Sequence, residues 1–385
     1  MRGPRVSTRR AASRTRRVVL PRSGHQPGTS GLTHAEPVTT DELFRLVVPE
    51  ARLSSSFATL RSGSGFAPAR AMMQRVYEQL GDRDGNFREQ FQTTGFDART
   101  WELYLFAALT NAGYELDRTH AVPDFVLHGH ERSWAVEATT ANPGPGSALQ
   151  APDDPRERQR YIDHELPIRL GSPLFSKLSR RYWEEPQVQG MPFVLALESF
   201  ASEDALTFSE TAIADYLYGT RSIAEVGPDG RLTVHNAEIA EHRNADKNIP
   251  SGFFQQPGAE NVSAVLFSNQ GTVGKFGRMA YQEGLERGKL RMFRRGLRAT
   301  LDPDAAVPSE FVYEVGSRWE SWSEGLVLIH NPGALLPLPD DILSQATHYR
   351  REGDDIVATS PSFHAFGSIT ITVDPVANSE GKQTR

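Results

Sequence analysis

Apolar residues at helical spacing mark the clearest structural element of the chain, the segment FDARTWELYLFAALTNAGYEL. Thr100 stands at the N-cap position of this stripe and Gly113 follows its last apolar residues. The spacing therefore predicts a helix over 101–112.

Helical patterns also precede this segment. TTDELFRLVV predicts a helix over 39–48, and a second helix is expected over 69–80. A loop rich in Ser and Gly at 54–64 separates the two. Residues 39–94 are therefore expected to form an N-terminal helical layer.

Beyond Gly113 the pattern changes to the short apolar runs of β-strands. A strand is expected near 114–116, followed by PDFVLHGHERSWAVEATT, in which two strands flank a polar turn. After a loop at 142–155, a helix starting at Ser172-Pro173 leads to PFVLALESF, a continuous apolar run typical of a strand covered on both faces. The order helix, strand, strand, strand, helix, strand predicts an α/β protein with a mixed central sheet.

Residues 201–385 show a less regular pattern. TFSETAIADYLYG predicts a helix, EVGPDGRLTV a hairpin around a Pro-Asp-Gly turn, and NVSAVLFSNQ, GLVLIHNP and SITITV predict strands. The sequence contains no internal repeat and no long linker. We therefore expect residues 201–385 to be a C-terminal α/β extension packed on the same sheet.

Composition narrows the possible chemistry. The chain has 385 residues, 38% of them hydrophobic, and no cysteine, so any metal must be held by carboxylate, imidazole or carbonyl groups. No apolar run approaches the ~18 residues that a membrane helix needs. The sequence predicts a soluble, cytoplasmic protein without a membrane partner.

Charge is distributed unevenly. The net charge is −6, yet residues 1–35 contain eight arginines and no acid before Glu36. An Arg- and Ser-rich start with few apolar residues cannot pack a core, so residues 1–38 are expected to be a disordered tail. Two interpretations stay open: a basic arm for nucleic acid or a transit peptide, and a tail without function or an upstream start codon.

Two acids interrupt the apolar pattern of the predicted hairpin. A turn at 129–132 places Asp124 directly opposite Glu137, and directly opposed residues of antiparallel strands point to the same face. Two carboxylates at this distance repel each other unless a cation lies between them, and Mg²⁺ is the natural occupant. The core side of the hairpin is formed by the alternate residues Phe125, Leu127, Trp134 and Val136.

Glu102 adds a third acid on the inward stripe of the 101–112 helix, together with Leu105, Phe106 and Leu109. A carboxylate on an inward face needs a partner, and a metal or a metal-bound water is one candidate. The alternative is that the helix dipole favours a Glu in the first turn.

Pro123-Asp124, twelve intervening residues and Glu137-Ala138-Thr139, preceded by the helix that bears Glu102, resemble the PD-(D/E)XK nuclease superfamily. The resemblance covers about residues 95–200 and extends to the αβββαβ order of the restriction-endonuclease-like core. It implies that Asp124 and Glu137 bind metal and that Glu102 completes the site. It also implies Mg²⁺ or Mn²⁺ as cofactor and nucleic acid, with DNA favoured, as partner; a dimer is possible.

The sequence departs from the family pattern at Thr139, which occupies the position of the family's lysine and brings no positive charge. Lys177, on the helix after the hairpin, is the preferred substitute, because relocation of this lysine to the neighbouring helix is known in the superfamily. The alternative is that Lys177 is a solvated surface residue and that catalysis is impaired.

Weaker candidates for nucleic-acid contact lie in two basic segments. Arg180 and Arg181 follow Lys177, and Lys275 and Arg278 follow a Gly-rich loop where a helix is expected to start. The sequence thus predicts metal-dependent phosphodiester hydrolysis. The alternatives are a nucleic-acid-binding protein that kept the fold but lost the chemistry, and a structural or regulatory partner protein.

Overall fold

The computed structural model describes residues 42–143, 150–202, 205–226, 232–244, 247–299 and 308–374. The predicted tail at 1–38 lies outside these residues. The α-helices of the described ranges are α1 (Ser55–Ser62), α2 (Ala67–Leu80), α3 (Phe87–Gln92), α4 (Phe96–Asn111), α5 (Pro155–Arg160), α6 (Leu166–Leu178), α7 (Thr211–Tyr218) and α8 (Val273–Glu283).

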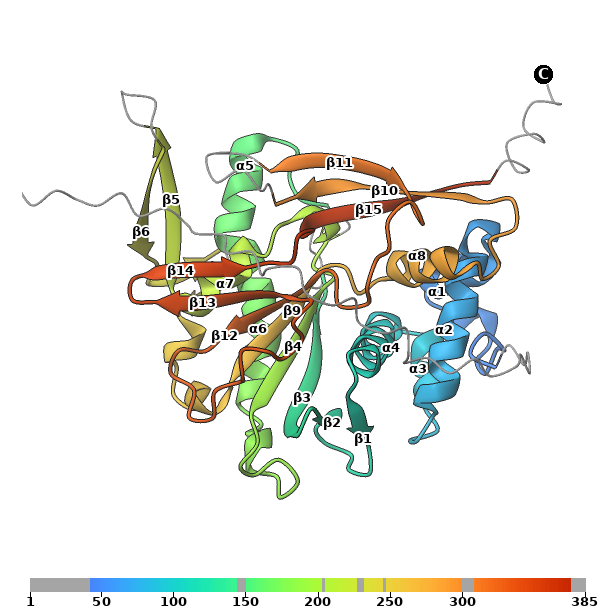
Figure 1. The fold of residues 1–385 in the computed structure, drawn as a ribbon, viewed down its shortest axis with the longest axis horizontal. Helices are drawn as coiled ribbons and strands as arrows, with labels where there is room; N and C mark the ends of the chain where they lie inside the picture. Colours follow the sequence, from blue (N-terminus) through green and yellow to red (C-terminus); the bar gives the residue numbers. More distant parts are fainter. Residues whose placement is uncertain are drawn as a thin grey trace, which may run out of the picture.

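A large mixed sheet organises the molecule, which is a mixed α/β protein (Figure 1). Its eight strands lie in the order β1-β2-β3-β4-β9-β12-β13-β14. The strands β1 to β3 form an antiparallel meander, and β3, β4 and β9 run parallel. The bounds are β1 (Glu115–Asp117), β2 (Phe125–Gly129), β3 (Arg132–Ala141), β4 (Phe193–Ser199), β9 (Ala264–Ser268), β12 (Leu326–His330), β13 (Thr347–Glu352) and β14 (Asp355–Thr359).

Three smaller sheets complete the described strands. One has three strands in the order β11-β10-β15, and the other two are the hairpins β5-β6 and β7-β8. The bounds are β5 (Thr220–Val226), β6 (Leu232–Glu238), β7 (Glu241–Arg243), β8 (Asn248–Pro250), β10 (Arg291–Arg298), β11 (Ser309–Glu314) and β15 (Ala365–Val373). The predicted SITITV strand therefore belongs to a separate sheet.

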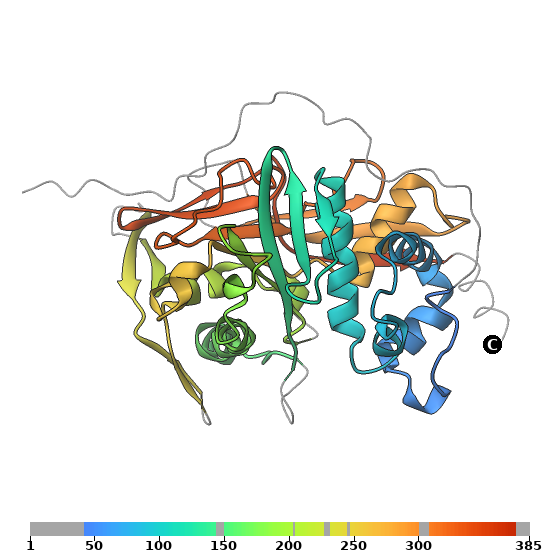
Figure 2. The ribbon, with the colours of Figure 1, turned by 90° about the horizontal axis from the view of Figure 1, so that it is seen from below.

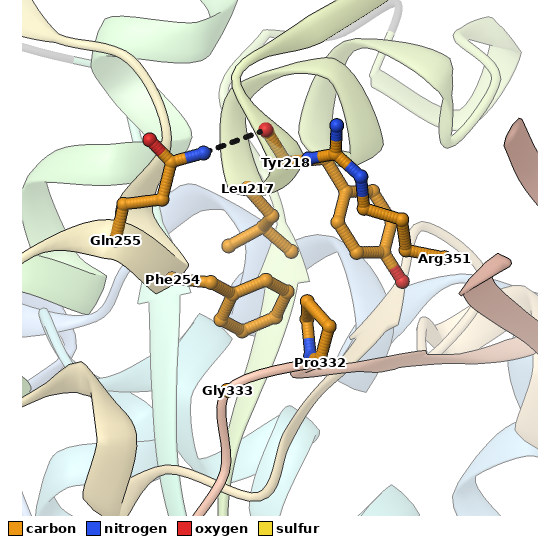
Figure 3. A pocket seen from close by; sticks show the side chains of 7 residues that line it. All are labelled: Leu217, Tyr218, Phe254, Gln255, Pro332, Gly333 and Arg351. Atoms are coloured by element: carbon orange, nitrogen blue, oxygen red, sulfur yellow. Dashed lines mark hydrogen bonds between the residues drawn. The ribbon is translucent and has the colours of Figure 1, made fainter. Parts of the chain in front are cut away.

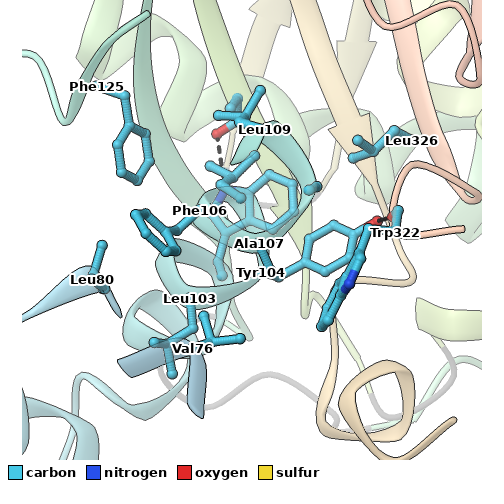
Figure 4. Packing of buried hydrophobic residues seen from close by; sticks show 14 of the residues in the cluster. Val76, Leu80, Leu103, Tyr104, Phe106, Ala107, Leu109, Phe125, Trp322 and Leu326 are labelled. Carbon is cyan, nitrogen blue, oxygen red and sulfur yellow. Dashed lines mark hydrogen bonds between the residues drawn. The ribbon is translucent and has the colours of Figure 1, made fainter. Parts of the chain in front are cut away.

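Helices cover both faces of the large sheet, as Figure 2 shows. Helix α4 packs on one face and α6 on the other, and α4 is backed by α2 and α3. Figure 4 shows the core on the α4 side, where Leu103 and Phe106 lie close to Val76, Leu80 and Phe125. Both faces of β4 are covered, so all seven of its residues are buried, and the residues from Phe193 to Leu197 are apolar.

The order α4, β1, β2, β3, α6, β4 is the order of elements that the sequence pattern predicts. Helix α4 starts one turn earlier than predicted, at Phe96. Thr100 lies inside it, where its hydroxyl donates a hydrogen bond to the Phe96 carbonyl (2.8 Å) rather than capping the helix.

Three predicted boundaries in other segments are wrong. The described part of 39–48 is a turn, because Leu43 is buried in the core and its N–H bonds the Gln74 side chain (2.8 Å). The predicted loop at 54–64 contains α1, which Ser54 caps. The helix expected from Pro173 begins at Leu166 and ends before Arg180.

None of the described helices is both long enough and apolar enough to cross a membrane.

Candidate functional site

The side chains of Asp124, which directly precedes β2, and of Glu137, in the middle of β3, lie opposite each other on the adjacent strands. The strands pair Phe125 with Val136, which confirms the predicted register and places Asp124 opposite Glu137. The Asp124 N–H donates to Glu137 Oε2 (3.2 Å), and the Ala138 N–H donates to Asp124 Oδ2 (2.7 Å). Each carboxylate is therefore oriented by the backbone of the opposite strand.

The alternation along β3 decides which face the pair occupies. Trp134 and Val136 point into the core beneath α4, whereas Ala135 belongs to the core on the α6 side. Glu137 has the parity of Ala135, so it points toward α6. This helix carries the next residue of the site.

Lys177, in the last turn of α6, forms an ion pair with Glu137 Oε1 through its ammonium group. The side chains are 19% and 4% exposed. Burial alone would lower the pKa of Lys177, but the charges of Glu137 and Asp124 together with the hydrogen bond to Glu137 raise it. Lys177 is therefore a charged, paired residue of the site and not a solvated surface lysine.

Thr139 lies two residues beyond Glu137 on β3, on the same face of the sheet and partly buried. Its hydroxyl brings no positive charge to this position. Lys177 supplies that charge from the neighbouring helix instead.

The segment after α6 contributes Tyr182, which the sequence pattern does not single out. Tyr182 is buried, and its ring centroid lies 5.7 Å from the Lys177 ammonium. Arg180 donates a hydrogen bond to the Tyr182 hydroxyl (3.0 Å). Arg181 is exposed and pairs with Glu184. Arg180 is exposed and close enough to Glu137 to interact with its charge, so an anionic ligand at the acid pair can approach Arg180.

Glu102 is buried as predicted, but its partners differ from the predicted ones. It projects from α4, on the other face of the sheet from Glu137, and it forms ion pairs with Arg99 and with Arg118, the latter at 3.6 Å. Two guanidinium groups bind its carboxylate in this structure, and its predicted role at a metal stays a prediction. It acts on the pair through its charge.

Asp124 carries the most perturbed carboxyl of the site. Its removal from water, followed by the negative charges of Glu137 and Glu102, raises its pKa from 3.8 to about 7. The Ala138 N–H and the Lys177 charge oppose this shift only in part. The Asp124 carboxyl therefore takes up a proton more readily in the folded chain than in water.

The raised pKa of Asp124 predicts how the stability of the chain depends on pH. The pKa of Asp124 is higher in the folded chain than in the unfolded chain, so folding binds a proton between pH 4 and pH 7 and stability falls as pH rises through that window. Between pH 5 and pH 8 we expect the free energy of unfolding of the wild type to fall by about 1–2 kcal/mol more than that of Asp124→Asn. This figure allows for the partial exposure of the Asp124 side chain. Urea unfolding of both proteins at pH 5 and pH 8 with a chelator measures this difference. Parallel pH profiles would contradict it.

A divalent cation fits the donor set of this pair. Among the described residues no group of three or more His, Cys, Asp or Glu side chains is placed to hold a metal, so the pair offers two carboxylates alone. Mg²⁺ is commonly bound by one or two carboxylates while it keeps several waters. After burial, the negative charges of Glu137 and Glu102 contribute to the raised pKa of Asp124, and a bound cation would offset them.

Lys275 and Arg278 are not at a nucleic-acid surface, which corrects their assignment as phosphate contacts. Their side chains are 0% and 2% exposed, and both bind the buried carboxylate of Glu320. The Gly271 N–H of the preceding loop donates to Glu198 Oε1 (3.0 Å). The loop and the start of α8 are therefore part of the interior.

Neither of two surface hollows includes the acid pair. The larger, of about 290 Å³, lies between α7 and the end of β12 (Figure 3). Its only charged lining residue is Arg351, and the Gln255 amide bonds the Tyr218 carbonyl (3.4 Å). Its lining contains no carboxylate and no imidazole, so this pocket has no such group to act as the general base of a hydrolysis.

Searches with the whole chain against protein-family models, curated proteins and solved structures found no match.

Proposed function

We propose that the chain is a nuclease that hydrolyses phosphodiester bonds with Mg²⁺ or Mn²⁺, with DNA as the favoured substrate. The main support for this proposal is the cluster of Asp124, Glu137 and Lys177, in which two opposed carboxylates lie beside one ammonium group. The sheet order β1-β2-β3-β4, with α4 before it and α6 before β4, supports a PD-(D/E)XK-like core over about residues 95–200.

In this proposal the carboxylates of Asp124 and Glu137 would hold the cation. The ion would acidify a bound water and offset the charge of the scissile phosphate. Backbone N–H groups already fix the orientation of both carboxylates, so the ligands need little rearrangement.

Lys177 would stabilise the negative charge that develops on the phosphate as water attacks. Its ammonium lies on the same face of the sheet as the pair and brings a positive charge that the hydroxyl of Thr139 cannot supply. Arg180 and Arg181 would contact the neighbouring phosphates of the bound strand. A local basic patch of this kind is needed because the chain as a whole is acidic.

Metal binding and cleavage test the proposal in two steps. Mg²⁺ is expected to raise the melting temperature of the wild type at pH 8 but not that of Asp124→Asn. Plasmid nicking in Mg²⁺ is expected of the wild type and not of Asp124→Asn. Asp355→Asn, in β14 at the opposite edge of the sheet, is the matched control and should behave as the wild type.

The result also separates the competing functions. A rise in melting temperature with Mg²⁺ but without cleavage would favour a nucleic-acid-binding protein that has lost nuclease activity. Thr139, in place of the family's lysine, supports that alternative. If neither Mg²⁺ nor Mn²⁺ changes the melting temperature, the metal site and the nuclease proposal are both wrong. A structural or regulatory partner protein is then the remaining function.

A further inference from the structure

The larger of the two surface hollows, which we call the α7 pocket, combines apolar walls with one positive charge (Figure 3). Its volume of about 290 Å³ lies at the lower end of the range that small-molecule sites cover. Asp124, Glu137 and Lys177 do not line it, so a ligand of this pocket would be independent of the proposed nuclease site. The volume favours a ligand with a single ring and a short side group.

Two aromatic side chains form the inner wall of the α7 pocket. Tyr218, at the end of α7, is 1% exposed, and Phe254, in a 3₁₀ turn after β8, is 7% exposed. Their ring centroids lie 5.6 Å apart, with an angle of 61° between the ring planes. The Tyr218 hydroxyl lies within hydrogen-bond distance of the carbonyl oxygens of His330 (2.9 Å) and Tyr349 (3.0 Å). These contacts fix the wall before a ligand binds, which lowers the entropic cost of binding.

The outer wall is the turn after β12. Asn331 fixes this turn, because its amide donates to two backbone carbonyls (2.8 Å each) and its Oδ1 accepts a hydrogen bond from the Gly333 N–H (2.9 Å). Between these two residues Pro332 presents its ring beside the ring of Phe254 (Figure 3). Flat apolar surfaces on both walls favour a planar ring as the body of the ligand.

Arg351 supplies the positive charge of the pocket. In β13 it has the parity of Tyr349, which lies in the core on the α6 side together with Tyr218, so its side chain extends toward α7. The Nε–H of Arg351 donates to the Gly353 carbonyl (3.2 Å). Within the part of the chain that the structure describes, no carboxylate forms an ion pair with its two terminal nitrogens. These nitrogens are therefore available to a ligand.

The charges around the pocket favour an anion with a single negative charge. Burial raises the pKa of Tyr218, and the charges of Arg350 and Arg351 oppose that rise, so both guanidinium groups act on the pocket wall. Arg350 is already paired with Asp340 (2.9 Å), which leaves Arg351 to balance one charge. A carboxylate carries one negative charge and fits the two-nitrogen fork of a guanidinium, whereas a phosphate monoester carries close to two.

We propose that the α7 pocket binds a small aromatic carboxylate, with its ring between Phe254 and Pro332 and its carboxylate on Arg351. A neutral ring of the same size would fill the apolar space but leave the guanidinium without a partner. The lining contains no carboxylate or imidazole that could act on the ligand, so the role of the pocket is binding and not turnover.

Isothermal titration calorimetry of the full chain with phenylacetate tests the proposal. We expect a dissociation constant of about 1 mM or lower for the wild type. Arg351→Gln should weaken binding by about tenfold or more, because two charge-assisted hydrogen bonds are lost. Arg295→Gln is the matched control: Arg295 is 63% exposed in the separate three-stranded sheet, so its substitution should leave the affinity unchanged. Circular dichroism checks that both variants fold.

Arg351→Lys gives a second test if Arg351→Gln fails to fold. Lysine keeps the charge but not the two-nitrogen fork, so its affinity for phenylacetate should lie between those of the wild type and Arg351→Gln. No binding of phenylacetate by the wild type at about 10 mM would overturn the proposal. Wild-type affinity in both Arg351 variants would overturn it as well.

Two related compounds test the chemical class of the ligand. Phenylacetamide has the same ring without the charge, and phenyl phosphate carries a phosphate in place of the carboxylate. Both should bind the wild type more weakly than phenylacetate does. Equal affinity for phenylacetamide would overturn the role of Arg351, and tighter binding of phenyl phosphate would overturn the assignment of a carboxylate.

Discussion

Replacing Glu320 by alanine is expected to lower the free energy of unfolding by about 3–5 kcal/mol. Glu320 is 2% exposed, and its carboxylate accepts hydrogen bonds from Lys275 (2.6 Å) and from two nitrogens of Arg278 (2.9 and 3.0 Å). Arg294 lies 3.4 Å away. The substitution would leave three cations in the interior without their shared partner.

The pH dependence of this effect follows from the same contacts. Burial alone would raise the pKa of Glu320, but Arg278, Lys275 and Arg294 hold it well below 4.5. The folded pKa is lower than the unfolded one, so the stabilisation is complete above the unfolded pKa and is lost as pH falls through the folded pKa. The difference between variant and wild type should therefore shrink in acid.

Urea unfolding at neutral pH measures the loss. Glu89→Ala is the matched control, because Glu89 also binds an arginine, Arg52, at 2.8 Å, but both side chains are more than half exposed. That variant should lose less than about 1 kcal/mol. Equal losses of unfolding free energy in the two variants would show that burial does not determine how much the Glu320 ion pairs stabilise the fold.

Replacing Lys177 by methionine is expected to slow metal-dependent cleavage by about 100- to 1,000-fold, given the proposed nuclease activity. The ammonium is the positive charge nearest to the carboxylate pair, and Thr139 cannot supply one. Methionine keeps much of the aliphatic packing against Tyr182 but removes the charge. The rate of a single turnover at saturating Mg²⁺ measures the effect.

Two comparisons separate a role in cleavage from a role in folding. The Lys177→Met variant should still gain thermal stability from Mg²⁺, since Asp124 and Glu137 are intact, and Lys177→Arg should recover part of the rate. Lys289→Met, at an exposed position, is the control and should cleave normally. An unchanged rate in Lys177→Met would assign that residue to the Glu137 ion pair alone.

Local pattern was sufficient for the hairpin and the elements around it. Two-residue alternation and a polar turn define the register of β2 and β3, because a shift by one residue would turn Phe125 and Val136 out of the core. The 69–80 helix and the apolar β4 strand follow from the same kind of regularity. The opposed position of Asp124 and Glu137 was therefore predictable from the sequence.

Strands with charged residues were harder to predict. RMFRRGLR and THYRRE form β10 and β13, although their arginines obscure the apolar pattern. In β10 the inward Arg294 is neutralised by Glu320 and Glu324, which lie far along the chain. Only distant contacts make such a residue compatible with a core, so propensity and periodicity do not reveal the strand.

The sequence by itself determined the order of the elements, the hairpin register and the pairing of two acids on one face, since these depend on neighbouring residues. Only the tertiary structure decided the partners of the charged side chains. It brought Lys177 to Glu137 across 40 residues, gave Glu102 to Arg99 and Arg118, and buried Lys275 and Arg278 around Glu320. A charged side chain has the same local pattern whether it faces solvent or a buried partner, and the packing of distant elements settles which one it meets.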